Sequence, residues 1–256
     1  MTIHNIHKNI IGTLLGTAFL VFGHSAAAHT TIADSSLTEG QSVYTASTIS
    51  HGCDGTAVRA QSILFPTGDN PLALDNNGNP VDLADHFVNV DHSGNESPLA
   101  SGSGVPASPS FVQDKNVFRT LTTNKDANGT KVGMTYNNGY LQADLRGWVP
   151  FRMSAPRFAS TSCADSIAIR IPILNACNKS AIAANRVDAW VGRLTAKYND
   201  PSVVSINFWP TVNVARDLDS NPLPLGCGGV AIQLDVSPND QQIDDFLGVP
   251  GYWPNN

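Results

Sequence analysis

The sequence has little charge of either sign and almost no glutamate. Asp, Glu, Lys and Arg together make up 14% of the 256 residues, and Glu39 and Glu96 are the two glutamates. The net charge of -6 comes with no basic stripe, so a nucleic-acid partner is not expected. Asn, Ser, Thr, Gly and Pro take the place of charged residues, and this mixture favours short strands joined by turns over long helices. We therefore expect an all-β protein.

Long apolar runs are missing after residue 28. The one apolar stretch, IIGTLLGTAFLVF at 10–22, is shorter than the roughly 20 residues that a bilayer requires. It follows Lys8 and precedes Ala26 and Ala28, two small residues in the positions that a signal peptidase reads. We expect residues 1–28 to be a signal peptide and 29–256 to be a single exported domain, periplasmic or secreted, that does not span the membrane. A retained membrane anchor is the alternative.

Cysteine is scarce and has no Cys-x-x-Cys spacing. Cys53, Cys163, Cys177 and Cys227 all follow residue 28, and an even number of cysteines in an oxidising compartment predicts two disulfides with three pairings open. A local closure between Cys163 and Cys177 would leave Cys53 to pair with Cys227. Free or metal-binding thiols are the alternative.

Alternating and β-branched stretches dominate the rest of the chain. We expect strands in 29–34, 41–50, 57–65, 116–124, 130–136, 140–154, 166–174, 189–198, 203–214 and 228–236. Their spacing, with Asn128-Gly129 and Asn138-Gly139 as turns, predicts a sandwich of two antiparallel sheets. The region 67–110 is expected to be a long loop insertion with little to bury. Residues 180–190 can hold one short helix.

Common catalytic signatures are absent. The sequence contains neither Gly-x-Ser-x-Gly nor His-Glu-x-x-His. Four histidines follow residue 28: His29, His51, His86 and His92. The pair in DHFVNVDH, His86 and His92, can form a second metal site or lie in a solvated loop.

His29 becomes the first residue if the chain is cut after Ala28. A terminal histidine offers its α-amine and its imidazole Nδ1 as a chelating pair, and nitrogen ligands in a tetragonal arrangement suit Cu(II). A hairpin turning near 38–40 would place residue 29 opposite about residue 49, with His51 at the same end of the ribbon. An exposed, frayed terminal residue is the alternative.

The opening segment resembles a known family. His29, Thr31, Gly40 and the run HGCDGT at 51–56 are similar to the start of the mature chain in the YcnI-type copper-binding domain family. The run INFWPTV at 206–212 is similar to a late strand of that family that ends in Phe-Pro-Thr-Val.

This resemblance implies an immunoglobulin-like β-sandwich related in architecture to the periplasmic CopC copper carriers. It also implies that the terminal histidine binds Cu(II) through amine and imidazole, with help from a carboxylate and a nearby tryptophan. His29 matches the family position, whereas no carboxylate can be matched. The tryptophan is Trp148, Trp190 or Trp209, and Trp209 lies in the matching late segment. The insertion, the second cysteine pair and the distance from Val212 to Cys227 depart from the family pattern.

Three functions remain open from the sequence. The first is an exported protein without turnover that sequesters or delivers Cu(II), with metal-site residues His29, His51 and Trp209 and a copper transporter or carrier as its partner. The second is a copper enzyme of the lytic polysaccharide monooxygenase type, in which His86 or His92 supplies the second histidine. The third is a surface or matrix protein whose terminal histidine is incidental.

Overall fold

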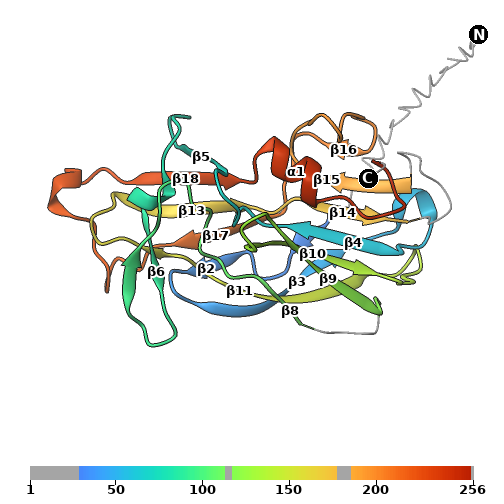
Figure 1. Ribbon diagram of the computed structural model, residues 1–256, viewed down its shortest axis with the longest axis horizontal. Helices are drawn as coiled ribbons and strands as arrows, with labels where there is room; N and C mark the ends of the chain where they lie inside the picture. The colour runs from blue at the N-terminus through green and yellow to red at the C-terminus, as the bar shows by residue number, and fades with distance from the viewer. Residues whose placement is uncertain (1–28, 113–116, 178–185, 255–256) are drawn as a thin grey trace, which may run out of the picture.

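Four β-sheets and one short helix make up the described chain (Figure 1). The computed structural model describes residues 29–112, 117–177 and 186–254. The four-stranded sheet has the order β1 (Thr31–Ile32), β3 (Ser42–Ile49), β11 (Gly147–Ser154) and β8 (Ser110–Phe111). The six-stranded sheet has the order β16 (Val204–Ser205), β15 (Val187–Trp190), β14 (Ile173–Ala176), β4 (Ala60–Leu64), β10 (Lys131–Asn137) and β9 (Thr120–Lys125). The five-stranded sheet has the order β2 (Ser36–Thr38), β17 (Thr211–Ala215), β13 (Ala164–Arg170), β18 (Ile232–Ser237) and β5 (Leu72–Asp75). A small sheet joins β12 (Arg157–Phe158), β6 (Phe87–Val90) and β7 (Glu96–Pro98).

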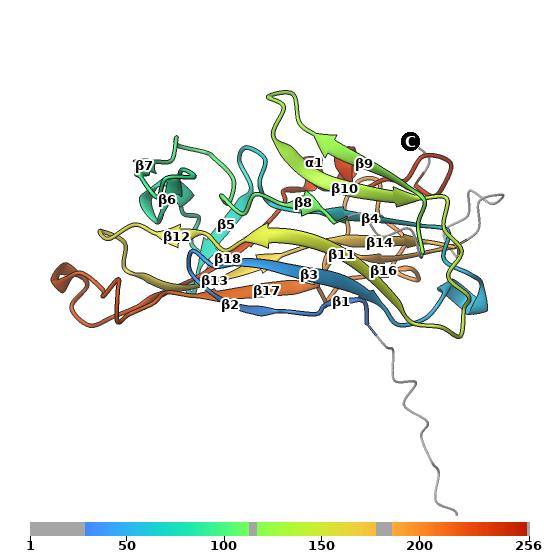
Figure 2. The ribbon, with the colours of Figure 1, turned by 90° about the horizontal axis from the view of Figure 1, so that it is seen from below.

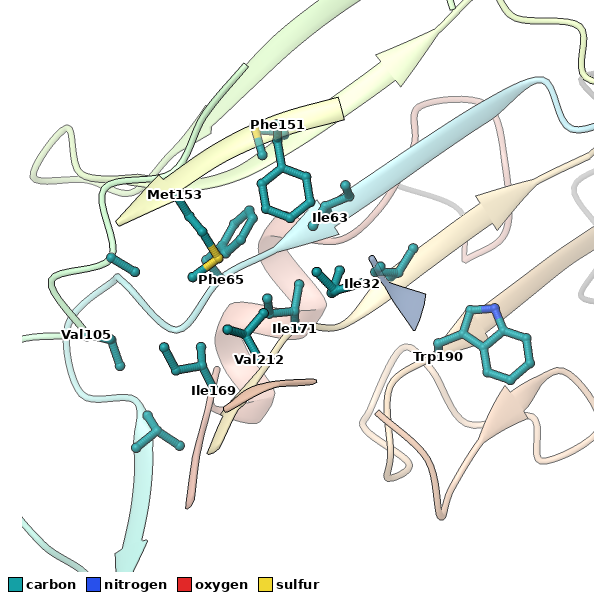
Figure 3. Packing of buried hydrophobic residues seen from close by; sticks show 14 of the residues in the cluster. Ile32, Ile63, Phe65, Val105, Phe151, Met153, Ile169, Ile171, Trp190 and Val212 are labelled. Atoms are coloured by element: carbon teal, nitrogen blue, oxygen red, sulfur yellow. The ribbon is translucent and has the colours of Figure 1, made fainter. Parts of the chain in front are cut away.

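The main core lies between the four-stranded sheet and the two larger sheets. Phe151 and Met153 of β11 pack toward Ile63 of β4 and Ile169 of β13, as Figure 3 shows. The alternation in β11 explains this arrangement, because its odd-numbered residues are buried and its even-numbered residues face outward. The predicted all-β class and the packing of sheets into a sandwich are confirmed.

A second core covers the other face of the six-stranded sheet. The helix α1 (Asp240–Phe246) and the residues after it place Ile243 and Leu247 against Ala60 and Leu64 of β4. This explains why every residue of β4 is buried, since the strand has a core on each face. No helix among the described residues is long and apolar enough to cross a membrane.

Three details differ from the expected sandwich. The pairs β13–β18, β15–β16 and β17–β2 are parallel, so the sheets are mixed. The expected helix at 180–190 is wrong for its last residues, because Val187–Trp190 form β15, while 178–185 lie outside the described residues. Asn138-Gly139 does not join a hairpin, since β10 and β11 belong to different sheets, whereas Asn128-Gly129 lies in the turn between β9 and β10.

The 67–110 insertion is rich in loops, as expected, but the expectation that it has little to bury is wrong. Leu83 and Phe87 are almost completely buried, as are Val105 and Ala107. The segment also supplies β5 to the five-stranded sheet and the β6–β7 hairpin to the small sheet. Its few apolar residues are spaced widely among polar ones, and each contacts the core separately.

The protein has two disulfides, as expected, but the favoured pairing is wrong. Cys53 is bonded to Cys177 and Cys163 to Cys227. The residues between Cys163 and Cys177 form β13 and β14, which run on from one sheet into the next. An extended segment of this length spans about 3.3 Å per residue, so its ends cannot meet.

Candidate functional site

The imidazole of His29 packs against two aromatic side chains. His29 stacks on Phe208, with ring centroids 4.3 Å apart and an interplanar angle of 20°. The ring of Trp190 meets His29 edge to face, at 5.1 Å and 89°. His29 is exposed to solvent overall, yet contacts on two sides hold its ring against the fold.

The backbone that follows His29 is anchored at once. Thr30 is 1% exposed, and its Oγ1 accepts a hydrogen bond of 2.8 Å from Asn175 Nδ2. Thr31 begins β1 and pairs with Thr48 of β3. The alternation of exposed and buried residues from 29 to 32 therefore places His29 on the outside of the sheet edge with its neighbour locked inside.

The indole nitrogen of Trp190 is buried without a hydrogen-bond partner among the described residues. Trp190 lies in β15 and is 9% exposed. Buried donors are normally paired, and leaving one unpaired costs about 1–3 kcal/mol.

Asp188 is the carboxylate that the sheet register brings toward this segment. It precedes Trp190 by two residues in β15, so both side chains lie on one face of the strand. Asp188 lies directly opposite Asn175, whose side chain reaches Thr30. Asp188 is therefore one strand away from the residue that follows His29.

The β1–β3 register argues against a shared face for His29 and His51. Continuing the β1–β3 register, in which Thr31 pairs with Thr48, places residue 29 opposite residue 50. The one-residue difference from the expected pairing turns His51 to the other side of the ribbon. His51 Nδ1 donates to the carbonyl oxygen of Gly52 at 2.9 Å. Its role as a metal ligand stays a prediction.

Trp209 lies next to Phe208 in the sequence. Among the described residues, the ring contacts of His29 are with Trp190 and Phe208, not with Trp209. Arg193 lies over the Trp209 ring at 5.0 Å, and the indole fills the space beside Gly192. Trp209 and Phe208 also line a cavity of about 550 Å³ that opens beside Thr31. Of the three candidate tryptophans, Trp190 is the one whose ring meets His29.

The other two histidines lie in a different part of the molecule. His86 Nδ1 lies 2.9 Å from Ser162 Oγ, and burial lowers the pKa of His86. Ser162 is 2% exposed, so this serine–histidine pair is closed to a substrate. His92 is exposed and lines a cavity with Ser42, at the end of β3 remote from Thr48. Six residues of a strand separate Ser42 from Thr48, about 20 Å.

Sequence reasoning missed Phe208 and Asp188. Phe208 lies in the INFWPTV segment that carries the family resemblance, next to the candidate Trp209, so the resemblance itself was a signal for it. Asp188 and Trp190 alternate with Val187 and Ala189, which is the signal of a half-buried strand. Expecting a helix over 180–190 concealed that signal.

Within the described part of the chain, no three His, Cys, Asp or Glu side chains are grouped so that they could hold a metal ion. A site at His29 therefore depends on the backbone amine as well as on side chains. No protein-family model and no curated protein sequence matches the chain. Among solved structures, the chain is similar to an uncharacterized protein from Nocardia farcinica with an immunoglobulin-like fold, at 12% sequence identity and a TM-score of 0.40. The match covers 73% of this chain and 98% of that chain.

Proposed function

We propose that this chain is an exported copper-binding protein that sequesters or delivers Cu(II). Removal of residues 1–28 makes His29 the first residue, and its α-amine and imidazole Nδ1 chelate the ion. The two disulfides are compatible with an oxidising compartment, here the periplasm or the cell exterior. A copper transporter or carrier is the partner that such a cargo requires.

The observation that carries this proposal is the fixed imidazole of His29. A ligand already held by Phe208 and Trp190 loses little conformational freedom when the metal binds. A frayed terminal histidine would lack this advantage.

The surrounding residues fit a Cu(II) cargo. Asp188 supplies the carboxylate that the sequence resemblance left unassigned. The two histidines that an oxidative copper enzyme would recruit, His86 and His92, lie in the part of the molecule that contains the small sheet. This distribution supports binding of copper without turnover.

The direct experiment compares two forms of the protein by Cu(II) electron paramagnetic resonance and competitive titration. One begins at His29, and the matched control carries one additional alanine before it. We expect tight binding with nitrogen hyperfine structure in the first form. The extra alanine should abolish it, because it moves the free amine away from the imidazole. Equal and weak binding by both forms would refute the proposal.

A second readout identifies the aromatic neighbour. Bound Cu(II) should quench tryptophan fluorescence, and Trp190→Phe should remove most of that quenching because Trp190 meets the His29 ring. Trp253→Phe is the matched control, since Trp253 packs against Tyr198 in the second core. Quenching that survives in Trp190→Phe as fully as in the control would place the copper elsewhere.

A further inference from the structure

A groove crosses the outer face of the four-stranded sheet, at the end remote from His29. Two cavities, of about 600 and 530 Å³, share Asn89, Pro106, Ser108 and Arg152 in their linings. They are therefore two halves of one open depression centred on Arg152, which we call the Arg152 groove. Its lining residues come from β3, β6, β8, β10, β11 and β12 and the loops beside them. Figure 2 shows β8, β11 and β3 next to one another, with β6 and β7 toward one end and the β9–β10 hairpin toward the other.

The floor of the Arg152 groove is a hydrogen-bonded polar network. Arg152 Nη2 donates to Ser42 Oγ at 2.8 Å, and Ser42 Oγ lies 3.0 Å from Ser154 Oγ. These residues occupy neighbouring outward positions of β3 and β11, where Ser154 pairs with Ser42 and Arg152 with Tyr44. The donors are thus held in place by a regular sheet.

An exposed aromatic ring lies beside Arg152, next to the residues that line the two cavities. Tyr44, directly opposite Arg152, is 72% exposed. Trp148, which comes four residues before Arg152 in β11, lies on the same face and is 55% exposed. The pair Ala46–Pro150 lies between the two aromatic residues, with Ala46 fully buried and Pro150 half-buried, so the two rings are separate exposed positions on this face. Large aromatic rings left in water on a flat face usually mark a binding surface.

Hydroxyl groups are frequent in the walls, and the net charge of the lining is small. The hydroxyl side chains around the first cavity are Thr67, Ser103, Ser108, Ser110 and Thr130. Two carboxylates, Asp69 and Asp91, and three cations, Lys131, Arg152 and Arg157, line the two cavities, so the lining carries a small net charge of +1. Hydrogen bonds from Asn128 and Asn95 already engage the two aspartates. Such a lining selects an uncharged ligand rich in hydroxyl groups over a strongly acidic or basic one.

A peptide strand fits this surface less well. The groove follows the edge strand β8, which offers two residues for pairing, Ser110 and Phe111. Addition of a further strand relies on main-chain hydrogen bonds along an edge, so an edge this short gives it little affinity. A sugar ring needs an aromatic face for its C–H side and fixed donors and acceptors for its hydroxyls. Tyr44 and the Ser42–Arg152 network provide both.

We propose that the Arg152 groove binds a neutral polysaccharide chain, with one sugar ring on Tyr44 and its neighbours hydrogen-bonded to Arg152, Ser42 and Ser154. The two cavities adjoin at the lining residues that they share, so together they offer room for more than one sugar ring. About 13 Å of strand separates Tyr44 from Thr48, the β3 residue that pairs with Thr31 near His29, so the binding does not require copper.

Affinity electrophoresis tests the proposal on the mature chain without copper, in native gels containing laminarin, xyloglucan, galactomannan or hydroxyethyl cellulose. We expect at least one of these polymers to retard the protein. Tyr44→Ala should weaken that binding about tenfold or more, as expected for the loss of one aromatic contact, and Tyr44→Trp should retain it. Tyr140→Ala is the matched control, because Tyr140 is 58% exposed and packs under Arg59 outside the groove.

The remaining outcomes would overturn the proposal. Retardation by none of the four polymers would do so, as would equal loss in Tyr44→Ala and Tyr140→Ala. Stronger retardation by polygalacturonate or polyglutamate would show that the groove selects charge instead. Circular dichroism and the urea midpoint of each variant separate loss of binding from loss of fold.

Discussion

Two glycines with nearly the same backbone angle differ in what surrounds them. Gly192 has φ +76° and Gly129 has φ +79°, a region that costs an L-residue about 1–2 kcal/mol. A Cβ on Gly192 would lie 1.8 Å from the Trp209 ring, whereas one on Gly129 would meet nothing within 4 Å. The close approach fixes Trp209, and with it the segment that carries Phe208 to His29.

We predict that Gly192→Ala lowers the free energy of unfolding by roughly 3 kcal/mol or more, since overpacking adds to the backbone cost. Gly129→Ala should cost about 1–2 kcal/mol, the backbone part alone. Urea titration of both variants measures the two losses. Similar losses in the two proteins would mean that the Trp209 ring does not press on the Gly192 backbone.

The candidate site shows which residues a sequence can reveal. His29 is visible because processing and metal chemistry both point to it. Trp190 and Asp188 are harder to find, because their roles depend on β15 pairing with β14 and on Asn175 reaching Thr30. The Asn175–Thr30 contact joins residues 145 positions apart, and no local pattern reports it.

At the scale of elements, three turns use one local design. Asp75, Asp91 and Asp126 each accept hydrogen bonds at Oδ1 from the backbone N–H groups two and four residues later. Each is followed three residues later by a glycine with positive φ. Such Asx turns follow from Asp, Asn and Gly chemistry alone, so this part of the fold can be predicted from sequence. The same is true of α1, where Asn239 and Gln242 form a capping box.

The disulfide pairing could not be predicted, because the sequence pattern does not show that β13 and β14 are two strands in different sheets. The run SIAIRIPIL reads as one strand, but Pro172 divides it between the five-stranded and the six-stranded sheet. Proximity in sequence therefore favoured Cys163 with Cys177, although the strand direction carries the two cysteines apart.

The two disulfides should differ in their effect on stability. They close loops of 124 and 64 residues, for which chain entropy predicts nearly equal contributions, within about 1 kcal/mol of each other. Cys53 and Cys177, however, are buried in the main core, while Cys163 and Cys227 are partly exposed. We predict that Cys53→Ala/Cys177→Ala lowers the unfolding free energy more than Cys163→Ala/Cys227→Ala, because it also leaves a cavity.

Chemical denaturation of the two double variants measures this difference. Peptide mapping without reduction should recover Cys53 linked to Cys177 in the parent protein. A larger loss from the Cys163–Cys227 pair would indicate that the core cysteines contribute no packing beyond chain entropy.

At the scale of the whole molecule, the class of fold followed from composition, while the arrangement of sheets did not. Low charge, turn residues and alternating strands indicated packed sheets. The small sheet of β6, β7 and β12 joins residues 87–98 with 157–158, and its partners could not be paired from local patterns. The apolar contacts of the insertion depend on this pairing, as Phe87 packs on Phe158.

The stability of the protein depends on pH through His86, the residue immediately before β6 of the small sheet. Burial lowers the pKa of His86 below its usual 6.5, even though Asp85 and Asp82 act in the opposite direction. As the pH falls below about 6.5, the His86 imidazole therefore takes up a proton more readily in the unfolded chain than in the folded protein. Stability from this group is complete above about pH 6.5 and is lost as the pH falls from there through the lowered pKa of the folded state.

We predict that the unfolding midpoint of the copper-free protein falls between pH 7 and pH 5, and that His86→Gln makes this fall shallower. His92→Gln is the matched control, because His92 belongs to the same segment but is exposed. Thermal unfolding across this range measures both slopes. The His86 side chain also meets Ser162 Oγ, so the variant should be less stable at pH 7 while losing less on acidification. An unchanged slope in His86→Gln would assign the acid sensitivity to other groups.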